Sequence, residues 1–319
     1  MLAAKLQGTT TCPKAKDVVN EMRVDRGLKM SYWQAWKARE NAVEMVRGCP
    51  KNSYKLLPSY LVLIKEANPG TVTEYLVDDD GSFKYAFLAL GPCLTEFSVM
   101  RKVIVVDCTF LTGKFKGALL SAICQDGNEQ IYPLPFGIAN GENDRSWEWF
   151  FCQLGSFIPD TADTVFISDR HASISRAIRK VYPSAKHGVC TYHLSKNLMT
   201  KFKCKRVTPL FKEAALAFTR SHFDRVFDHL RKIDEGVAKY LEEIDVRMWS
   251  RAYFEGCRYN IMTSNIVESW NSVLKGAKDY PIVPLFEHIR QTLTQASSTL
   301  RHLPSVGTSS DVLLPINND

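Results

Sequence analysis

The sequence predicts an α/β protein in which a mixed β-sheet is flanked by helices. From residue 102, three β-rich runs follow one another, separated by short loops that contain glycine. A helical segment, an uncharged β-rich run, a second helical segment and a short β-rich run then alternate, which is typical of strands joined by helices. A long, basic, helix-rich region and one more helix complete this pattern.

The first hundred residues are predicted to form helices followed by a hairpin. The expected helices are Lys14–Met22, Tyr32–Arg47, which Ser31 caps and Gly48 ends, and about Pro58–Ala67 with Pro58 in its first turn. Two β-rich runs, Thr71–Val77 and Phe83–Ala89, surround an Asp-Gly turn. The three aspartates before Gly81 are therefore interpreted as turn residues rather than as a metal cluster.

The order of the later elements defines the sheet. The expected meander strands are Lys102–Asp107, Ala118–Cys124 and Ile131–Ala139. They are followed by a helix at Asn143–Phe157, a strand at Thr164–Ser168, a helix at Ala172–Tyr182, a strand at His187–Cys190 and a last helix at Ser264–Lys278 before Pro281. This is the chain order of the ribonuclease H-like fold. It implies a five-stranded mixed sheet, an antiparallel meander of three strands plus two parallel strands, with an all-α insertion before the last helix.

Three regions are expected along the chain. Residues 1–100 form an N-terminal helical segment plus the hairpin. Residues 101–295 form the ribonuclease H-like domain, with the helical insertion at about 195–260. Residues 296–319, which contain few large apolar side chains, are expected to be a mobile tail.

Composition excludes several classes of protein. The 319 residues are 45% hydrophobic and 24% charged, which is ordinary for a globular chain and unlike a collagen-like or disordered one. No apolar run reaches the ~20 residues of a membrane span, and no secretion signal is recognised at the start, so cytosol or nucleus is expected. Nine cysteines without a Cys-x-x-Cys pair indicate reduced, mostly buried thiols rather than disulfides or a four-cysteine zinc site.

The net charge of +7 is concentrated in one part of the chain. Between residues 176 and 232 there are fourteen Lys and Arg against three Asp and Glu, a local net charge of +11 that leaves −4 for the rest. A basic stretch of this kind suits a polyanion, because each neutralised phosphate releases counterions. Solvated faces of surface helices are an equal alternative from charge alone.

Two aspartates occur where apolar β-rich runs end. Asp107 closes Val103-Ile-Val-Val-Asp and Asp169 closes Val165-Phe-Ile-Ser-Asp. A buried carboxylate is costly unless it is paired or binds a metal. In a ribonuclease H-like sheet these two strands are neighbours, so both carboxylates are expected at one edge.

Glu268 is the third acidic candidate, one helical turn from Asn265 and from Asn271 on a polar stripe of the last helix. Three such carboxylates can hold two Mg²⁺ ions about 3.5–4 Å apart for in-line attack on phosphorus. A lone Asp at a strand end is more often a loop cap or part of a salt bridge. Only the combination of all three acidic residues with the order of the fold indicates a metal site.

At these residues the sequence resembles the plant Mutator-like element (MULE) transposases. The resemblance spans roughly residues 15–295 and rests on five ordered motifs: Val106-Asp-Cys-Thr-Phe110, Pro135-Phe-Gly-Ile-Ala-Asn-Gly-Glu-Asn143 with Ser146-Trp-Glu-Trp-Phe150, Ser168-Asp-Arg-His171, Cys190-Thr-Tyr-His-Leu194 and Asn265-Ile-Val-Glu-Ser-Trp-Asn271. It implies a DDE-type catalytic domain at 101–295 that uses two Mg²⁺ or Mn²⁺ ions. Asp107, Asp169 and Glu268 match its three acidic positions.

The resemblance also implies partners and supporting residues. The substrate would be DNA, both the transposon ends and the target. The expected location is the nucleus, and a homo-oligomer is expected by analogy. The candidates for phosphate contacts are Lys196, Lys201, Lys203, Lys205 and Arg206. The family's Cys-x-x-His signature matches Cys190 and His193, for which a structural or DNA-positioning role is favoured over a zinc site. His171 is expected either to orient Asp169 or contact phosphate, or to be a surface histidine at a helix start.

Two departures from the family pattern leave the biological activity open. Neither an N-terminal zinc-binding DNA-recognition module nor a C-terminal SWIM zinc finger is recognised in the sequence. A truncated copy is one interpretation of this difference. The leading hypothesis is an active DDE transposase core. The alternative is a domesticated or truncated, non-catalytic DNA-binding or transcription-regulating protein that resembles the far-red-impaired-type plant proteins.

Overall fold

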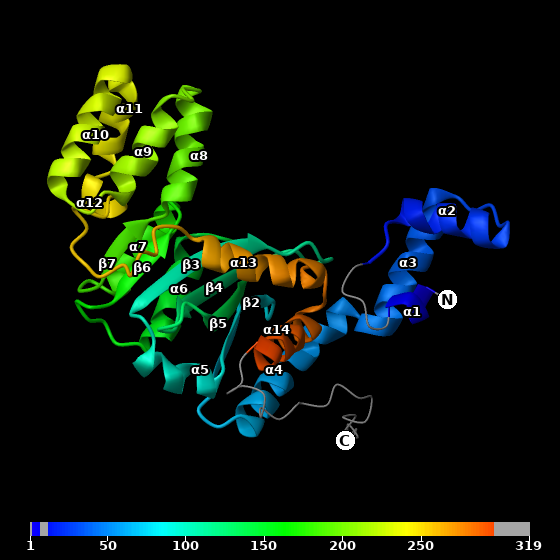
Figure 1. Ribbon diagram of the computed structural model, residues 1–319. Helices are drawn as coiled ribbons and strands as arrows, with labels where there is room; N and C mark the ends of the chain where they lie inside the picture. Colours follow the sequence, from blue (N-terminus) through cyan, green and yellow to red (C-terminus); the bar gives the residue numbers. More distant parts are fainter. Residues whose placement is uncertain (1, 7–11, 297–319) are drawn as a thin grey trace.

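Seven strands form one mixed sheet at the centre of the computed structural model, which describes residues 2–6 and 12–296 (Figure 1). The strands are β1 (Val72–Val77), β2 (Phe83–Ala89), β3 (Val103–Phe110), β4 (Ala118–Gln125), β5 (Ile131–Ala139), β6 (Val165–Ser168) and β7 (Lys186–Val189). Their order across the sheet is β1-β2-β5-β4-β3-β6-β7. Across the sheet, every neighbouring pair in the series β1-β2-β5-β4-β3 is antiparallel. Strands β3, β6 and β7 run parallel to one another. The predicted meander and the two parallel strands are confirmed.

The N-terminal hairpin is part of the same sheet, so the prediction of five strands was wrong. Strand β2 pairs with β5 over Tyr85–Leu88, which extends the meander by two strands. The physical reason is that the last five residues of β2, Tyr-Ala-Phe-Leu-Ala, are all buried in the fold. A strand that is buried on both faces needs a partner on each side as well as cover above and below. The predicted turn is present, with Gly81 at a positive φ of 76°.

Helices cover both faces of the sheet. Phe150 of α6 (Asp144–Gly155) packs against Gly137 of β5, whereas Trp270 of α13 (Asn265–Val273) packs against the adjacent Phe136. Successive strand residues point to opposite faces, so α6 and α13 lie on opposite sides of the sheet. Helix α7 (Ala172–Val181) packs beside α6.

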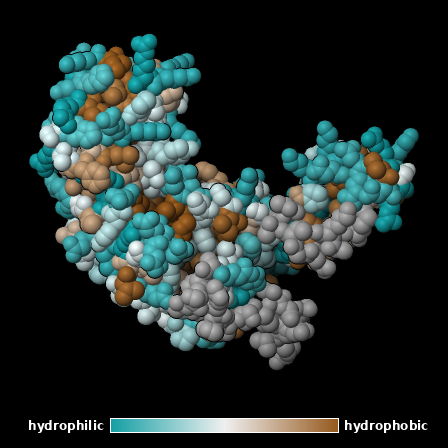
Figure 2. Space-filling view, viewed as in Figure 1, coloured by the Kyte–Doolittle hydropathy of each residue, from teal (hydrophilic) through white to brown (hydrophobic). Residues whose placement is uncertain are grey.

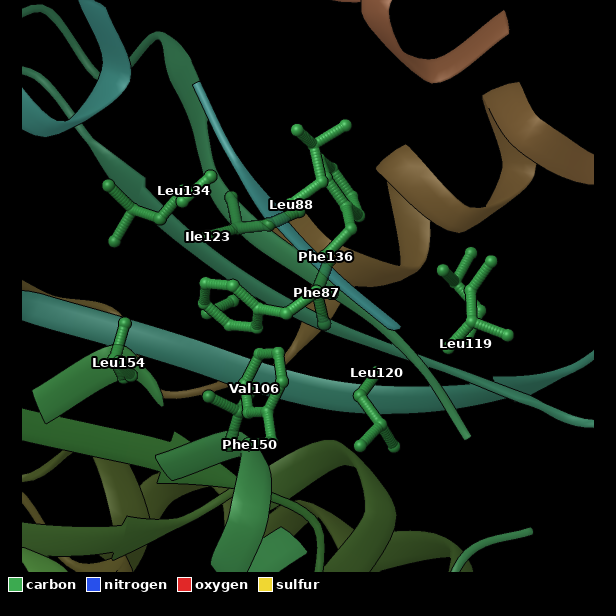
Figure 3. Close-up of a cluster of buried hydrophobic side chains, with 14 of the residues drawn as sticks. Phe87, Leu88, Val106, Leu119, Leu120, Ile123, Leu134, Phe136, Phe150 and Leu154 are labelled. Atoms are coloured by element: carbon green, nitrogen blue, oxygen red, sulfur yellow. The ribbon is translucent and has the colours of Figure 1, made fainter. Parts of the chain in front are cut away.

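The core between these layers is apolar and rich in aromatic rings. Figure 3 shows Phe87 and Leu120 on the side of α6, where Phe87 lies 5.7 Å from Phe150 between ring centroids. Leu88 and Phe136 point to the other side. All of these side chains are at most 1% exposed, and burial of each contributes about 1.5–3 kcal/mol.

The helix predicted at Ser264–Lys278 ends at Val273 and continues as a 3₁₀ turn, and two other helices differ more from the prediction. Helix α4 runs over Pro50–Ala67, so Pro58 lies inside it rather than in its first turn. Pro58 cannot donate a hydrogen bond to the carbonyl of Tyr54, but a continuous buried stripe holds the helix together: Ser53, Leu57, Tyr60, Leu61 and Ile64. Helix α14 (Ile282–Ala296) was not predicted, although Pro281 precedes it and its buried residues recur at helical spacing: Ile282, Leu285, Phe286, Ile289 and Leu293.

A helical bundle projects from the β6–β7 end of the sheet (Figure 1). Its members are α8 (Thr191–Phe202), α9 (Val207–Leu216), α10 (Arg220–Ile233), α11 (Glu235–Glu243) and α12 (Val246–Trp249). The bundle has its own hydrophobic cluster, in which the fully buried Trp249 contacts the rings of Phe211, Phe223 and Phe227. A basic sequence therefore still forms an independent apolar core.

The remaining elements are at the N-terminus and in connections. Helices α1 (Leu2–Leu6), α2 (Ala15–Arg26) and α3 (Tyr32–Arg47) form an arm beside α4 (Figure 1). Ser31 caps α3 and Gly48 ends it, as predicted, and Gln34 completes a capping box with Ser31. The connections contain α5 (Gly91–Glu96) and two 3₁₀ turns, η1 (Phe97–Val99) and η2 (Leu274–Ala277).

The tail predicted at 296–319 lies, apart from Ala296, outside the described residues. None of the described helices is both long and apolar enough to cross a bilayer.

Candidate active site

The register of two parallel strands places the two aspartates predicted from the sequence at equivalent positions along β3 and β6. Val105 of β3 is aligned with Ile167 of β6, and Asp107 and Asp169 each follow two residues later. Strand β3 continues to Phe110, so Asp107 lies within the strand, opposite Ser121 of β4, and not at its end as predicted. Both carboxylates still extend from the same edge, because β6 stops at Ser168.

Helix α13 adds Glu268 and Asn271 above β3. The Nδ2 of Asn271 donates a hydrogen bond to Oδ2 of Asp107 at 3.0 Å. Glu268 lies in the first turn of the helix, and its negative charge acts on Asp107. The structure thus brings Asp107, Asp169 and Glu268 into one acidic cluster, whereas Asn265 points to solvent as an exposed residue.

The electrostatics of this cluster are visible at Asp107. Burial raises the pKa of its carboxyl, and the neighbouring charge of Asp169 raises it further, to about 7. The Cys108 backbone N–H and His193 oppose this shift, and Glu268 adds to it. Carboxylates that disfavour one another's ionisation form a site that attracts cations.

The oxygen donors around Asp107 fit a hard divalent cation. Carboxylate oxygens of Asp107, Asp169 and Glu268 are ligands that Mg²⁺ and Mn²⁺ prefer. The buried Oδ1 of Asn271 has no hydrogen-bond partner in the described structure, and an unpaired buried acceptor is costly unless a cation or a donor reaches it. Within residues 2–6 and 12–296, no three Asp, Glu, His or Cys side chains already surround one cation position. The donor chemistry fits, and the side chains would have to adjust around a cation.

The Cys-x-x-His motif lies at the start of α8, next to Glu268. His193 Nε2 is 3.5 Å from Glu268 Oε1, and Ser264 lies between the motif and this carboxylate. Burial raises the pKa of the Cys190 thiol, but hydrogen bonds from His193 and Ser264 outweigh burial and leave this pKa below its ordinary value. The hydrogen bond with Cys190 raises the pKa of His193, and the charges of Glu268 and Asp107 act in the same direction.

His171 and Glu142 support Asp169 from the side of α6. The backbone N–H of His171 donates to Oδ1 of Asp169 at 2.9 Å, and the imidazole Nδ1 lies 3.7 Å from Oε1 of Glu142. Glu142 also accepts a hydrogen bond from Trp147 Nε1 at 3.1 Å. Sequence reasoning did not single out Glu142, although it lies in the second of the five motifs, just before the helix that carries Trp147.

Lys278 is a second residue that sequence reasoning missed. It follows η2, and its Nζ donates a hydrogen bond to Thr109 Oγ1 on β3. Burial lowers the pKa of this ammonium group, and the nearby charge of Asp107 partly opposes the shift. The signal was its place at the predicted end of the Glu268 helix. A cation therefore lies beside the acidic cluster.

The predicted phosphate contacts follow α8 away from this cluster. Lys196 is one turn beyond His193, its charge interacts with Glu268, and its Nζ lies 4.4 Å from the ring centroid of Tyr192. The exposed Lys201, Lys203, Lys205 and Arg206 are near the far end of the helix, which spans 12 residues or about 18 Å. Figure 2 shows that much of the surface of this bundle is hydrophilic, with apolar residues exposed among the polar ones.

Tyr240 links the bundle to the strand end that carries Asp169. The Arg170 guanidinium hydrogen-bonds to the Tyr240 hydroxyl, and its carbon lies 5.2 Å from the ring centroid. Lys201 Nζ lies 4.2 Å from the same centroid. Two cations thus contact one aromatic ring, and each such contact contributes about 0.5–1 kcal/mol at exposed sites.

Comparison with known proteins agrees with the first four of the five motifs, which lie within residues 106–194. Residues 103–197 match the family of the MULE transposase domain. The chain is 24% identical over 165 residues to Protein FAR1-RELATED SEQUENCE 5 of Arabidopsis thaliana, covering 51% of this chain and 20% of that protein. For Protein FAR1-RELATED SEQUENCE 6 of the same plant, the identity is 22% over 143 residues, covering 45% and 20%.

A third similarity is to the PKS-NRPS hybrid synthetase cheA of Chaetomium globosum, 24% over 118 residues, which are 35% of this chain and 2% of that protein. The chain therefore spans a fifth or less of the length of these curated relatives. The matched family segment contains Asp107, Asp169, Cys190 and His193, whereas Glu268 lies beyond it. The resemblance predicted from the motifs is confirmed: residues 103–197 of this chain match the MULE transposase domain.

Proposed function

We propose that this chain is a Mutator-like DDE transposase core that binds DNA and catalyses divalent-metal-dependent strand cleavage and transfer. The sheet is then a ribonuclease H-like sheet enlarged by the β1-β2 hairpin. One observation carries the proposal: Asp107 and Asp169 follow the same register position of neighbouring parallel strands, and the charge of Glu268 reaches Asp107 from α13.

The residues have distinct roles in this proposal. Asp107 and Asp169 would hold Mg²⁺ or Mn²⁺, and Glu268 would complete the ligands. When bound, two such ions activate water or a 3′-hydroxyl and stabilise the leaving oxygen. Asn271 orients Asp107 through its 3.0 Å hydrogen bond, and the His171 N–H orients Asp169 in the same way.

DNA binding is assigned to the positive charge around the cluster and along the bundle. Lys278 and Lys196 contribute cations beside Asp107 and Glu268, where a phosphodiester would approach. This positive charge continues along the backbone of the bound DNA duplex through four further residues: Lys201, Lys203, Lys205 and Arg206. Transposon ends and target DNA are the proposed partners, the nucleus is the proposed location, and a homo-oligomer is the proposed assembly.

Metal-dependent cleavage tests the catalytic proposal directly. Wild-type protein should nick and join supercoiled or linear DNA with Mg²⁺ or Mn²⁺, and Asp169→Asn should lower the rate at least 100-fold. Asp163→Asn is the matched control, because this exposed acid precedes β6 at the opposite end from Asp169. Equal rates for the wild type and Asp169→Asn would refute the assigned site.

The second candidate function is a non-catalytic, transposase-derived DNA-binding protein that regulates transcription. The similarity to the two FAR1-related sequence proteins favours it. The same experiment separates the two functions, since this candidate binds DNA with no metal-dependent cleavage in either the wild type or Asp169→Asn. Loss of DNA binding on substitution of the α8 lysines would then still be expected.

A further inference from the structure

The Cys-x-x-His motif lies where the chain passes from the sheet into the bundle. Cys190 directly follows β7 and is the N-cap of α8, and His193 is in the first turn of that helix. About seventy residues later the chain returns through Met262 and Ser264, the N-cap of the helix that carries Glu268. The starts of α8 and α13 therefore lie side by side.

Backbone and side-chain hydrogen bonds join these two helix starts. The backbone N–H of Ser264 donates to Cys190 Sγ at 3.1 Å. Thr191 donates twice to the Met262 carbonyl, from its N–H and from its Oγ1, each at 2.9 Å. Cys190 and Ser264 are both 0% exposed, so water cannot replace these contacts without opening the structure.

The hydroxyl of Ser264 is the centre of a smaller network that includes Glu268. Its Oγ is 3.2 Å from Cys190 Sγ, 3.3 Å from His193 Nδ1 and 3.2 Å from Glu268 Oε1. A hydroxyl has one proton, so it donates to either the sulfur or the carboxylate at a given moment. The backbone N–H maintains the contact with Cys190 in both cases.

The same geometry argues against a nucleophilic role for the motif. A nucleophilic cysteine must be reachable by substrate, whereas Cys190 is fully buried and contacts Ser264. The contacts of the motif lead instead to Ser264 and Glu268.

We propose that Cys190 and His193 are positioning residues for Glu268. Cys190 fixes the first turn of α13 through Ser264, and His193, 3.5 Å from Glu268 Oε1, holds that carboxylate on the side of Asp107. This inference rests on the proposed function in one respect, that Glu268 is a ligand in the reaction. It also joins α8, which carries Lys196 and Lys201, rigidly to the helix that carries Glu268.

Amide hydrogen exchange tests the link between the helices without any need for catalysis. In Cys190→Ala, the amides of Ser264–Glu268 should exchange at least 10-fold faster than in the wild type, because the buried acceptor is lost. Cys190→Ser retains an acceptor and should restore most of the protection. Cys152→Ala, at an exposed cysteine of α6, is the matched control and should leave α13 unchanged. Unchanged exchange in folded Cys190→Ala would overturn the link.

Cleavage kinetics test the role of His193. His193→Ala should lower kcat about 10–100-fold with little change in KM for DNA, as is typical for residues that orient a metal ligand. His193→Gln should recover part of the rate, and His222→Gln, at a half-exposed histidine of α10, should have no effect. If Asp169→Asn is inactive and His193→Ala cleaves at the wild-type rate, the positioning role is wrong. If the wild type itself does not cleave, the catalytic proposal fails and the exchange experiment still decides the link.

Discussion

At the scale of single residues, burial shifts the titration of groups in and next to the strands β3, β6 and β7. Asp107 is the clearest case in the acidic cluster, with its pKa raised to about 7 by burial and by Asp169. His187 on β7 shows the opposite direction. Burial, followed by the charges of Arg258 and Arg179, lowers its pKa to about 4, and Ser168 Oγ is its hydrogen-bond partner at 2.9 Å.

The shift at His187 predicts a loss of stability in acid. The unfolded chain binds a proton near the ordinary pKa of 6.5, while the folded protein resists protonation until about pH 4. Stability is therefore complete above pH 6.5 and falls as the pH is lowered from 6.5 towards 4. Linkage sets the loss between pH 7 and pH 5 at about 2 kcal/mol.

Urea unfolding of the wild type and of His187→Gln at pH 7 and pH 5 measures this loss. Glutamine can keep a hydrogen bond with Ser168 but does not titrate. The free energy of unfolding of the wild type should therefore fall about 2 kcal/mol further than that of the variant. Parallel pH dependence in both proteins would show that His187 is readily protonated in the fold.

At the scale of elements, close contact between α6 and β5 sets the spacing of one layer. A Cβ at Gly137 would lie 2.7 Å from Phe150 Cδ2, whereas a Cβ at Gly127, in the β4–β5 turn, would meet nothing within 4 Å. Phe150 is fully buried and cannot move aside without shifting its neighbours.

Gly137→Ala should therefore destabilise the protein by about 1–3 kcal/mol through overpacking. Gly127→Ala should be neutral or stabilise it by up to about 1 kcal/mol. Thermal or urea unfolding of the two variants measures the difference. A Gly137→Ala protein as stable as the Gly127→Ala control would mean that α6 can retreat from the sheet at little cost.

At the scale of the whole molecule, the distribution of charge predicts how DNA binding responds to salt. If Lys201, Lys203 and Lys205 each contact one phosphate, replacing all three by Ala should reduce the slope of log K against log salt by about 2.7. The matched control replaces Lys51, Lys55 and Lys65, which are equally exposed on α4. Fluorescence anisotropy with a labelled duplex at several salt concentrations measures both slopes. Equal slopes would place the DNA elsewhere on the molecule.

Most elements could be predicted because their signals are local. Ser31, Gln34 and Gly48 define α3 by capping alone, and the alternation of apolar strands with amphipathic helices gave the order from β3 to β7. The place of the hairpin in the sheet, the start of α4 and the presence of α14 were not predicted. The place of β2 beside β5 depends on pairing between distant residues, and the buried stripe that carries α4 through Pro58 gains its stability only from packing.

The candidate site divides in the same way. The residue types and motif order by themselves determined the resemblance to the MULE transposase domain and which acidic residues to examine. Only the tertiary structure decided that β3 continues past Asp107, that Asn271 contacts Asp107, and that Cys190 and His193 face Ser264 and Glu268. The physical reason is that motifs record local chemistry, whereas these contacts join residues 71 to 164 positions apart, whose proximity is set by strand register and helix packing.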